Sequence, residues 1–266
     1  MALTLSELNI YPVKSAAGIS VTTAQVQLRG LAFDRRWMIT DPNGKFMTQR
    51  QFPRMALIDV QIVKDRLHLA APGMEGIAID PAADHPSTTV EVWGDFCQAI
   101  PAAAPVNHWL SRFLDLPCQL VYMPDDSIRP VDSQYAIDPA NDHVSFADGF
   151  PFLLIAEASL QDLNARLETP IPMNRFRPNF VVSGCEPFAE DAWRKIRIGS
   201  VVFHLVKLCS RCAVTTVDQA TGVMGKEPLL TLAKYRLQQG NILFGQNLVA
   251  EGAGAIQVGD AIEVLE

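Results

Sequence analysis

Residues 209–218 read Cys209-Ser-Arg-Cys212, followed directly by Ala-Val-Thr-Thr-Val-Asp218. This stretch holds two of the five cysteines of the chain and lies within a segment rich in β-branched residues. Two cysteines separated by two residues commonly bind a metal or exchange thiol for disulfide. Cysteines are also commonly buried as small apolar side chains that need no ligand. The rest of the sequence has to distinguish between these possibilities.

Zinc binding and thioredoxin-like chemistry both fit this stretch poorly. A closed zinc site needs four ligands, but Cys97, Cys118 and Cys185 are isolated and the nearest histidine is His204. A thioredoxin-like dithiol begins at a helix N-terminus, where the helix dipole lowers the pKa of the thiol. The β-branched residues after Cys212 instead predict a strand or a loop.

The wider stretch 207–222 resembles the signature of the MOSC-domain family, in particular its amidoxime-reducing branch. Six other segments carry the same resemblance, in the family's order and across nearly the whole chain: 11–15, 30–37, 150–160, 175–179, 184–193 and 244–247. The resemblance implies two closely joined β-barrel-like units, an N-terminal barrel-like domain over 1–122 and a MOSC domain over 123–266. It also implies a molybdenum–molybdopterin cofactor whose metal is held by a cysteine thiolate, and that cysteine matches Cys212.

Composition and charge define the class of protein. The chain has 266 residues, of which 48% are hydrophobic and 19% charged, as expected of one large or two ordinary packed domains. The net charge of −7 argues against a general surface for nucleic acid or anionic membranes. No apolar run approaches the ~18 residues of a membrane span, and no export signal is visible. Scattered cysteines, odd in number, fit a reducing compartment, so we expect a cytoplasmic protein.

Many strands and few helices are predicted. In the first half we expect a hairpin of 37–40 with 45–48 around an Asn-Gly turn, a strand over 57–63, and a helix carrying Val106, Leu110, Phe113 and Leu114. A polar connection follows over 122–150. The second half predicts strands over 152–155, 180–182, 196–198 and 201–206, a helix after a capping box at 159–162, a helix opened by Pro228, and a final hairpin of 255–258 with 261–264. The fold class is therefore β-rich, mixed α/β, with peripheral helices.

The metal-binding residue is expected within the cysteine motif. Molybdenum prefers soft sulfur ligands, and thiolate is the softest that a protein offers. Spacing alone leaves Cys209 as a competing ligand, whereas the resemblance assigns the role to Cys212. Ser210 and Arg211 are expected to contact the cofactor; Arg211 could lower the pKa of a thiolate or be an ordinary surface arginine. Thr215, Thr216 and Asp218 continue the motif, and one or two of them are expected to be strand or turn residues only.

Cationic side chains elsewhere are candidates for binding cofactor phosphate and pterin. The resemblance places Lys14, Ser15 and Arg35 in the cofactor site, although Lys and Arg are usually ordinary surface charges. The role of Arg36 stays open, since relatives are expected to carry an apolar residue there. Arg177 matches the family position better than Arg175 does.

Two further polar residues have alternative interpretations. Asn179 could bind the pterin or fix its own loop. Asp148, in the polar connection, is a candidate catalytic residue that could relay protons or bind pterin nitrogens, or a turn-forming residue beside Gly149.

The resemblance implies an oxidoreductase that removes oxygen from small N-hydroxylated compounds. A non-catalytic cofactor carrier or sulfur-transfer module is the alternative, and a thiol–disulfide oxidoreductase is a more distant one. The chain shows neither the C-x4-C-x2-C spacing of a plant-type ferredoxin nor a glycine-rich dinucleotide fingerprint. We therefore expect a separate electron-donor redox protein as partner, and no nucleic acid.

Overall fold

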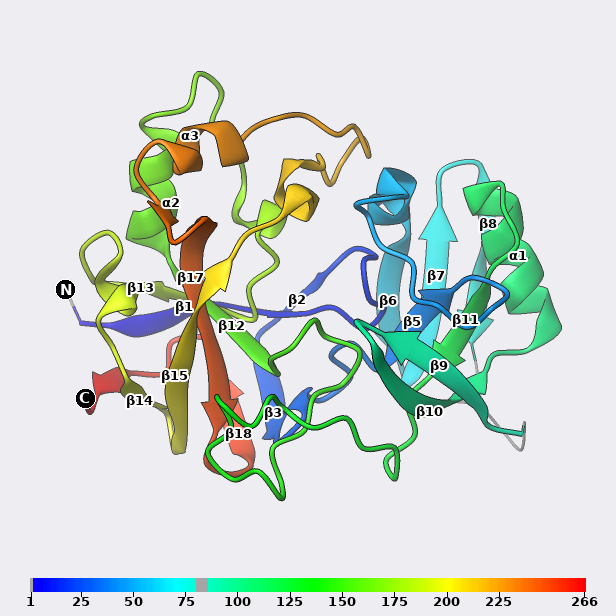
Figure 1. The fold of residues 1–266 in the computed structure, drawn as a ribbon, viewed down its shortest axis with the longest axis horizontal. Helices are drawn as coiled ribbons and strands as arrows, with labels where there is room; N and C mark the ends of the chain where they lie inside the picture. Colours follow the sequence, from blue (N-terminus) through cyan, green and yellow to red (C-terminus); the bar gives the residue numbers. More distant parts are fainter. Residues whose placement is uncertain (1, 80–85) are drawn as a thin grey trace.

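A computed structural model describes residues 2–79 and 86–266. The chain forms a larger part, on the left in Figure 1, and a smaller part on the right. Strands predominate in both, and the few helices lie at the periphery, which confirms the β-rich class. In the described ranges, no helix combines the length and the apolar character needed to cross a membrane.

The larger part is built on a nine-stranded sheet in which eight strands follow the order β19-β14-β15-β17-β12-β13-β1-β2, and β16 pairs with β17. Its strands are β1 (Thr4–Ile10), β2 (Ile19–Val21), β12 (Phe152–Ala156), β13 (Phe180–Ser183), β14 (Lys195–Ile198), β15 (Val201–Ser210), β16 (Leu237–Gln238), β17 (Asn241–Ala250) and β19 (Ile262–Val264). A three-stranded sheet of β18 (Gly254–Gln257), β3 (Thr23–Gln27) and β4 (Gly30–Leu31) completes it. Helices α2 (Glu157–Asn164) and α3 (Leu229–Ala233) lie beside the large sheet.

The core of the larger part explains why its central strands are continuous apolar runs. All five residues of β12 are buried, as expected for a strand covered on both faces. The Phe152 ring lies 5.5 Å from that of Phe180 and 5.3 Å from that of Phe203, between ring centroids. Burying such rings is a main source of stability for a domain of this size.

The smaller part combines a four-stranded sheet, a three-stranded sheet and helix α1 (Ala104–Leu114). Its strands are β5 (Trp37–Thr40), β11 (Gln119–Tyr122), β10 (Asp95–Pro101) and β9 (Thr88–Val92) in the first sheet, and β6 (Asp59–Val63), β7 (Arg66–Ala71) and β8 (Met74–Ile79) in the second. The helical spacing of Val106, Leu110 and Phe113 predicted α1 correctly, and all three side chains are buried. Short 3-10 helices are η1 (Pro53–Leu57), η2 (Met173–Arg175), η3 (Ala189–Asp191) and η4 (Ala213–Thr216).

The first strands of the chain lie in the larger part. Strand β1 pairs with β13, and β3 pairs with β18, so residues 4–31 are surrounded by elements of the second half. The connection over 122–150 has neither helix nor strand beyond β11, as predicted. The division into domains 1–122 and 123–266 stays a prediction about sequence units.

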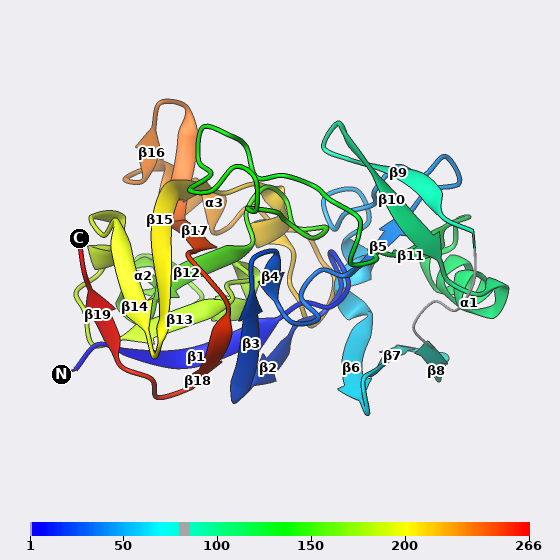
Figure 2. The same cartoon turned by 90° about the horizontal axis from the view of Figure 1, so that it is seen from below.

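The final hairpin is a wrong prediction. Strand β18 pairs with β3 and β19 pairs with β14, so the two strands diverge into different sheets (Figure 2). The cause is β1, because the Leu5 N–H donates to the Asp260 carbonyl and the Gly259 N–H donates to the Leu5 carbonyl. These bonds from a distant strand separate the two segments at their turn.

Three element boundaries also differ from the predictions. Helix α2 begins at Glu157, and Ser159 lies inside it, where its hydroxyl donates to the buried Glu190 carboxylate instead of capping the helix. After the Asp41–Gly44 turn, residues 45–48 form only isolated bridges, because Phe46 bonds to Glu91 of β9. Pro228 is the residue before α3, which ends at Ala233.

Candidate functional site

The cysteine motif joins the end of β15 to the short helix η4. Cys212 is extended and caps η4, with φ −122° and ψ −180°. The hydroxyl and the N–H of Thr215 both donate to the Cys212 carbonyl, at 3.0 and 3.1 Å, and the Thr216 hydroxyl donates to Ala213 at 2.8 Å. These back-bonding threonines favour a helical turn over an extended strand. The prediction of a strand or loop after Cys212 is therefore wrong.

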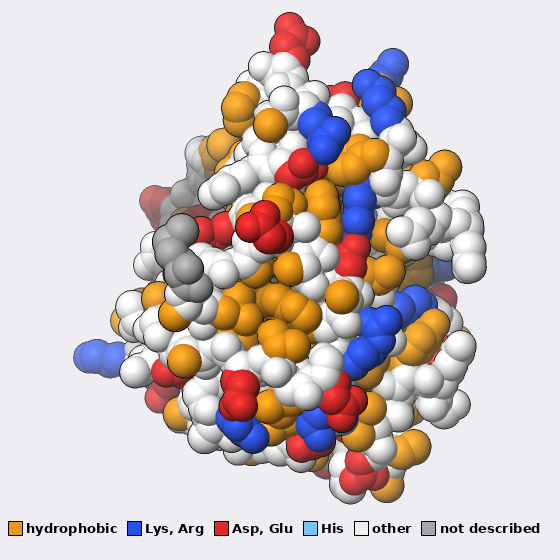
Figure 3. All heavy atoms as spheres, turned by 90° about the vertical axis from the view of Figure 1, so that its left-hand side faces the viewer, with side chains coloured by type: hydrophobic (Ala, Val, Ile, Leu, Met, Phe, Trp, Pro, Cys, Tyr) orange, Lys and Arg blue, Asp and Glu red, His pale blue; other side chains and the backbone are white. Residues whose placement is uncertain are grey.

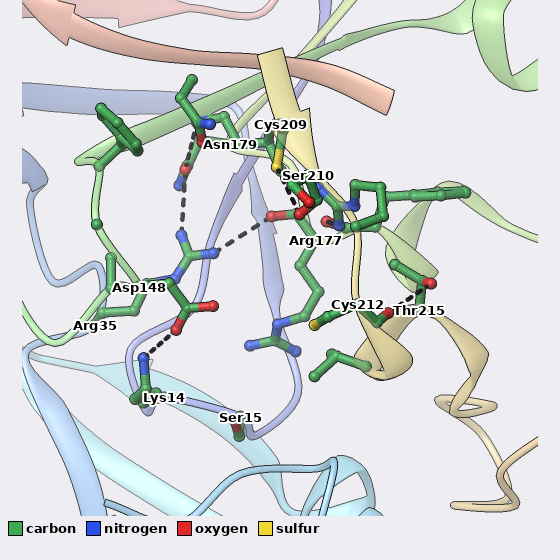
Figure 4. Close-up of a pocket in the computed structure, with 18 of the residues that line it drawn as sticks. Lys14, Ser15, Arg35, Asp148, Arg177, Asn179, Cys209, Ser210, Cys212 and Thr215 are labelled. Carbon is green, nitrogen blue, oxygen red and sulfur yellow. Dashed lines mark hydrogen bonds and ion pairs between the residues drawn. The ribbon is translucent and has the colours of Figure 1, made fainter. Parts of the chain in front are cut away.

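The motif forms one wall of a pocket of about 290 Å³ where the two parts of the molecule meet (Figure 4). The pocket brings together every residue for which a catalytic, metal-binding or cofactor-binding role is predicted: Lys14, Ser15, Arg35, Asp148, Arg177, Asn179, Ser210, Arg211 and Cys212. Cys209, the competing ligand, also lines it. Residues far apart in the chain thus share one site, while their individual roles stay predictions.

The pocket is strongly cationic although the chain is acidic. Its cationic lining residues are Lys14, Arg35, Arg50, Arg177, Lys207 and Arg211, against the single carboxylate of Asp148. On the face shown in Figure 3, in contrast, basic and acidic side chains are interspersed. Clefts lined by one sign of charge concentrate ligands of the opposite sign. The pocket therefore suits a phosphate-bearing or otherwise anionic ligand.

Lys14 and Asp148 form an ion pair, with 2.5 Å between Nζ and Oδ1. Lys14 is buried and also donates to the Phe146 carbonyl at 2.7 Å, whereas the Asp148 side chain is 66% exposed to the pocket. Burial lowers the pKa of Lys14 to about 8, although Asp148 opposes this shift. Desolvation by the surrounding pocket walls would raise the pKa of Asp148, but Lys14 and the Trp93 indole outweigh this effect and hold that pKa well below its ordinary value.

Tyr11 separates two arginines of the pocket. The guanidinium carbons of Arg35 and Arg177 each lie 4.3 Å from the centre of its ring. Arg177 also donates to the Ala16 carbonyl at 2.6 Å, and burial lowers its pKa to about 10. The aromatic ring stabilises both cations by cation–π contact. It thereby keeps two like charges close together beside the pocket.

Arg35 is anchored by a polar network below the pocket. It donates to Asp34 Oδ2 at 2.6 Å, and to Asn179 Oδ1 at 3.2 Å. The Asn179 amide group also donates to the Asn9 carbonyl at 3.1 Å and accepts from the Leu153 N–H at 3.3 Å. Because its oxygen and nitrogen already have partners in the chain, Asn179 positions Arg35 and its own loop, which favours the structural interpretation.

Three pocket residues have left-handed backbone conformations. Their φ angles are +65° at Ser15, +48° at Arg35 and +58° at Arg177. Such conformations are uncommon outside glycine, and each costs of order 1 kcal/mol or more. Strained backbone of this kind concentrates at ligand-binding sites. Here the strained backbone places the guanidinium groups of Arg35 and Arg177 and the hydroxyl of Ser15 at the lining of one pocket.

The two motif cysteines have different surroundings. The Cys209 sulfur accepts a hydrogen bond from Arg211 at 3.0 Å, and Arg211 also donates to the Phe176 carbonyl at 2.6 Å. The Cys212 sulfur has no hydrogen-bond partner within residues 2–79 and 86–266. Figure 4 shows its side chain pointing from the wall towards the middle of the pocket. Arg211 therefore contacts Cys209, and Cys212 presents the uncommitted sulfur.

Arg36 and Arg175 have structural contacts outside the pocket. Arg36 donates to the Met123 carbonyl at 2.5 Å and pairs with Asp125 at 2.7 Å, so it fixes the start of the long connection. Arg175 donates to the Thr215 carbonyl at 2.8 Å and supports the cysteine motif from behind. Asp218, 3.5 Å from Arg175, caps the turn after the motif through Thr221.

The sequence reasoning missed several lining residues. Thr48, Arg50, Lys207 and Asn247 also border the pocket. Lys207 and Asn247 lie within the segments that carry the family resemblance, which is the signal that could have identified them. Arg129 was also missed: it is buried and donates to the Ala147 and Asp148 carbonyls, so it holds the loop that presents Asp148.

Comparison with known proteins identifies the family of the chain. The family model of the MOSC N-terminal beta barrel domain matches residues 2–117, and the family model of the MOSC domain matches residues 141–263. The chain belongs to the MOSC-domain family. Its N-terminal match ends near the smaller part's last strands, and its C-terminal match contains the cysteine motif.

Several curated relatives match nearly the whole chain. The mitochondrial amidoxime-reducing component 1 of Mus musculus is 38% identical over 98% of this chain and 82% of that protein, and the one of Homo sapiens is 37% identical over 98% and 83%. The molybdenum cofactor sulfurase of Oryza sativa subsp. japonica is 34% identical over 91% of this chain, but over only 32% of the sulfurase.

The residues of the pocket fit a molybdenum cofactor. Within the described residues, no cluster of three or more His, Cys, Asp or Glu side chains could hold a metal by itself. A metal at this place would need most of its ligands from another source, as a pterin dithiolene supplies, with one soft sulfur from the protein. The buried Arg211 Nε has no partner in the described structure, which leaves a donor for a ligand.

Proposed function

We propose that this protein binds a molybdenum–molybdopterin cofactor and reduces small N-hydroxylated compounds. The observation that carries the proposal is the uncommitted Cys212 sulfur, which points into a pocket lined by six cationic side chains. The similarity to amidoxime-reducing components supports the reaction class. When bound, the cofactor supplies the two-electron chemistry that removes oxygen from an N–O bond.

The chain would bind and orient the cofactor through its cationic residues. Arg177 and Arg35 would contact cofactor phosphate or pterin oxygens with charge-assisted hydrogen bonds, and the Lys14 ammonium would add positive charge beside them. Cys212 would be the single protein ligand of the metal. Ser15 and Ser210 line opposite sides of the pocket and would add neutral hydrogen bonds.

Lys14 would supply a proton to the oxygen that leaves the substrate. With a pKa of about 8, the Lys14 amine carries its proton at neutral pH, and the resulting ammonium is a stronger acid than that of an ordinary lysine. Asp148 is ionised, because its pKa is held low, so it would orient Lys14 and accept hydrogen bonds, not donate a proton.

A carrier or sulfur-transfer role is the second candidate. It is favoured by the similarity of this chain to about a third of a molybdenum cofactor sulfurase, and by a second cysteine beside Cys212. In such a module the cofactor would remain bound without turnover of an N-hydroxylated compound.

The test is metal analysis of natively purified protein, followed by an assay with an amidoxime and an artificial reductant. Molybdenum in about equal amount to protein, with formation of the amidine, is expected. Bound molybdenum without amidine would favour the carrier role. Folded protein that holds no molybdenum after preparation in a cofactor-producing host would contradict both roles. The expected separate electron donor and the cytoplasmic location are part of the proposal, the latter checked by cell fractionation.

A further inference from the structure

A second cavity of about 410 Å³ adjoins the cofactor pocket in the smaller part of the molecule. It is lined by Lys45, Phe46, Thr48, Arg50, Gln51, Glu91, Trp93 and Gly94. Thr48 and Arg50 line both spaces, so the cavity borders the cofactor pocket. Neither a predicted role nor the proposed cofactor contacts account for its aromatic walls.

Trp93 is an unusual residue for its position. Trp93 and Gly94 form the two-residue connection between β9 and β10, with φ +56° and +90°. A primed turn of this kind favours Asn, Asp or Gly, and a bulky residue with positive φ is an outlier. The Trp93 side chain is nevertheless 45% exposed. Neither turn geometry nor core packing explains a tryptophan there, and such strain is typical of functional sites.

The Trp93 ring is held from three sides. The Phe46 ring lies 4.8 Å away and is tilted by 51°, and the guanidinium carbon of Arg50 lies 4.2 Å from the centre of the indole. The indole N–H donates to Asp148 Oδ1 at 3.0 Å. Since Asp148 also pairs with Lys14, the aromatic wall is connected directly to the proposed proton donor.

We propose that the space bounded by Phe46, Arg50 and Trp93, here called the Trp93 subsite, binds the planar conjugated part of the substrate. This inference rests on the proposed function and adds the feature that selects substrates. Aromatic walls with a guanidinium group favour flat, uncharged, π-electron-rich rings, by stacking and cation–π contact. The adjoining cationic pocket disfavours positively charged rings. Trp93 is thus a specificity-determining residue, and aromatic or heteroaromatic N-hydroxylated compounds are preferred over alkyl ones.

The test compares benzamidoxime with acetamidoxime in cofactor-loaded protein. Trp93→Asn removes the ring but keeps a residue that the turn favours, whereas Trp93→Phe keeps an aromatic ring. Both variants lose the hydrogen bond to Asp148, so their difference isolates the ring. We expect Trp93→Asn to reduce the kcat/KM ratio of benzamidoxime to acetamidoxime about tenfold, and Trp93→Phe to retain most of it. Phe96→Ala, on the same hairpin and 71% exposed but outside the subsite, is the matched control and should leave the ratio unchanged.

Three outcomes would overturn the assignment. One is an equal loss for both substrates in Trp93→Asn, which would show a purely structural role. Another is an unchanged ratio. The third is loss of bound cofactor from Trp93→Asn in protein that stays folded, which would make the subsite part of the cofactor's own binding surface.

Calorimetric titration separates this inference from the proposed function. If cofactor-loaded protein turns over neither amidoxime, the proposed function fails. The subsite is then tested only by the affinities of the two amidoximes. Tighter binding of benzamidoxime than of acetamidoxime, lost in Trp93→Asn and kept in Trp93→Phe, would support the subsite. Equal binding in all three proteins would reject it.

Discussion

At the scale of single residues, the pocket distinguishes side chains that the sequence presents as equivalent. Cys209 and Cys212 are separated by two residues, yet Arg211 engages only the Cys209 sulfur. Arg35 and Arg36 are adjacent, but Arg35 lines the pocket, whereas Arg36 donates a hydrogen bond to the Met123 carbonyl. Strand pairing and turns set the direction of each side chain, and that direction decides its role.

Replacing each cysteine in turn tests the assignment of the metal ligand. Cys212→Ala is expected to abolish turnover of an amidoxime, because among the described residues it removes the pocket sulfur that has no hydrogen-bond partner. Cys209→Ala should retain most activity, since its sulfur packs against Arg211. Activity and molybdenum content are measured together on the two variants. Full activity in metal-loaded Cys212→Ala protein would reject the assignment.

The lowered pKa of Lys14 predicts a pH dependence of anion binding. Lys14 has a pKa of about 8, below the ordinary 10.5, so its positive charge disappears as the pH rises through 8. The affinity of cofactor-free protein for sulfate, whose charge is constant in this range, should therefore fall between pH 7 and 9. Bound anion favours the charged form and moves the fall to higher pH.

Lys14→Arg provides the control, because arginine stays protonated over this range. Calorimetric titration of sulfate at several pH values should show a clear fall for the unchanged protein and a flat profile for the variant. An identical fall in both proteins would mean that another group, such as a thiol, causes it.

At the scale of elements, close approach of two strands builds the pocket floor. Gly245 of β17 has φ +82°, and a Cβ there would meet Ile155 Cγ1 at 2.6 Å and the Leu154 carbonyl at 2.8 Å. Only glycine therefore lets β17 lie against β12 at this point. The same two strands carry Leu153 and Asn247, which line the pocket.

Gly245→Ala is expected to destabilise the protein by about 2–4 kcal/mol, from a left-handed alanine and an overpacked contact. Gly240 offers the comparison, with a similar φ of +79° but no atom within 4 Å of an added Cβ. Gly240→Ala should cost about 1 kcal/mol. Urea unfolding measures both, and similar losses for the two variants would refute the role of close packing.

At the scale of the whole molecule, the pocket depends on both parts of the chain. Lys14, Thr48 and Arg50 approach from the first fifth of the sequence, and the cysteine motif approaches from the last quarter. Strand β1 belongs to the large sheet, which ties the loop carrying Lys14 to the same framework as β15. A site assembled in this way is preorganised by the sheet.

Electron supply is also a property of the whole molecule. The cysteines outside the pocket, Cys97, Cys118 and Cys185, are single free thiols that form no metal-binding cluster within the described ranges. We therefore expect loaded protein to give no sustained turnover of an amidoxime with NADH or NADPH alone. Adding a reductase and carrier protein should restore it, as measured by amidine formation. Sustained turnover with the nucleotide alone would contradict this prediction.

Local patterns predicted the elements whose stability is local. The apolar spacing of Val106, Leu110 and Phe113 identified α1, and the apolar run from Phe152 to Ile155 identified β12. Where distant groups compete, the patterns failed: Glu190 recruited Ser159 from its expected cap, and Leu5 separated the two last strands. Long-range partners cannot be deduced from periodicity, because they depend on which strands meet.

The sequence by itself determined the family, the β-rich class and part of the set of residues that gather at the pocket, since these depend on motifs and on side-chain chemistry. Only the tertiary structure decided what each of them contacts. It showed that Cys212 is the uncommitted sulfur, that Asn179 is used within the chain, and that Trp93 stands beside Asp148. The physical reason is that a contact between residues over fifty positions apart exists only after sheets and turns have folded. Direction, burial and the resulting pKa values arise at that stage.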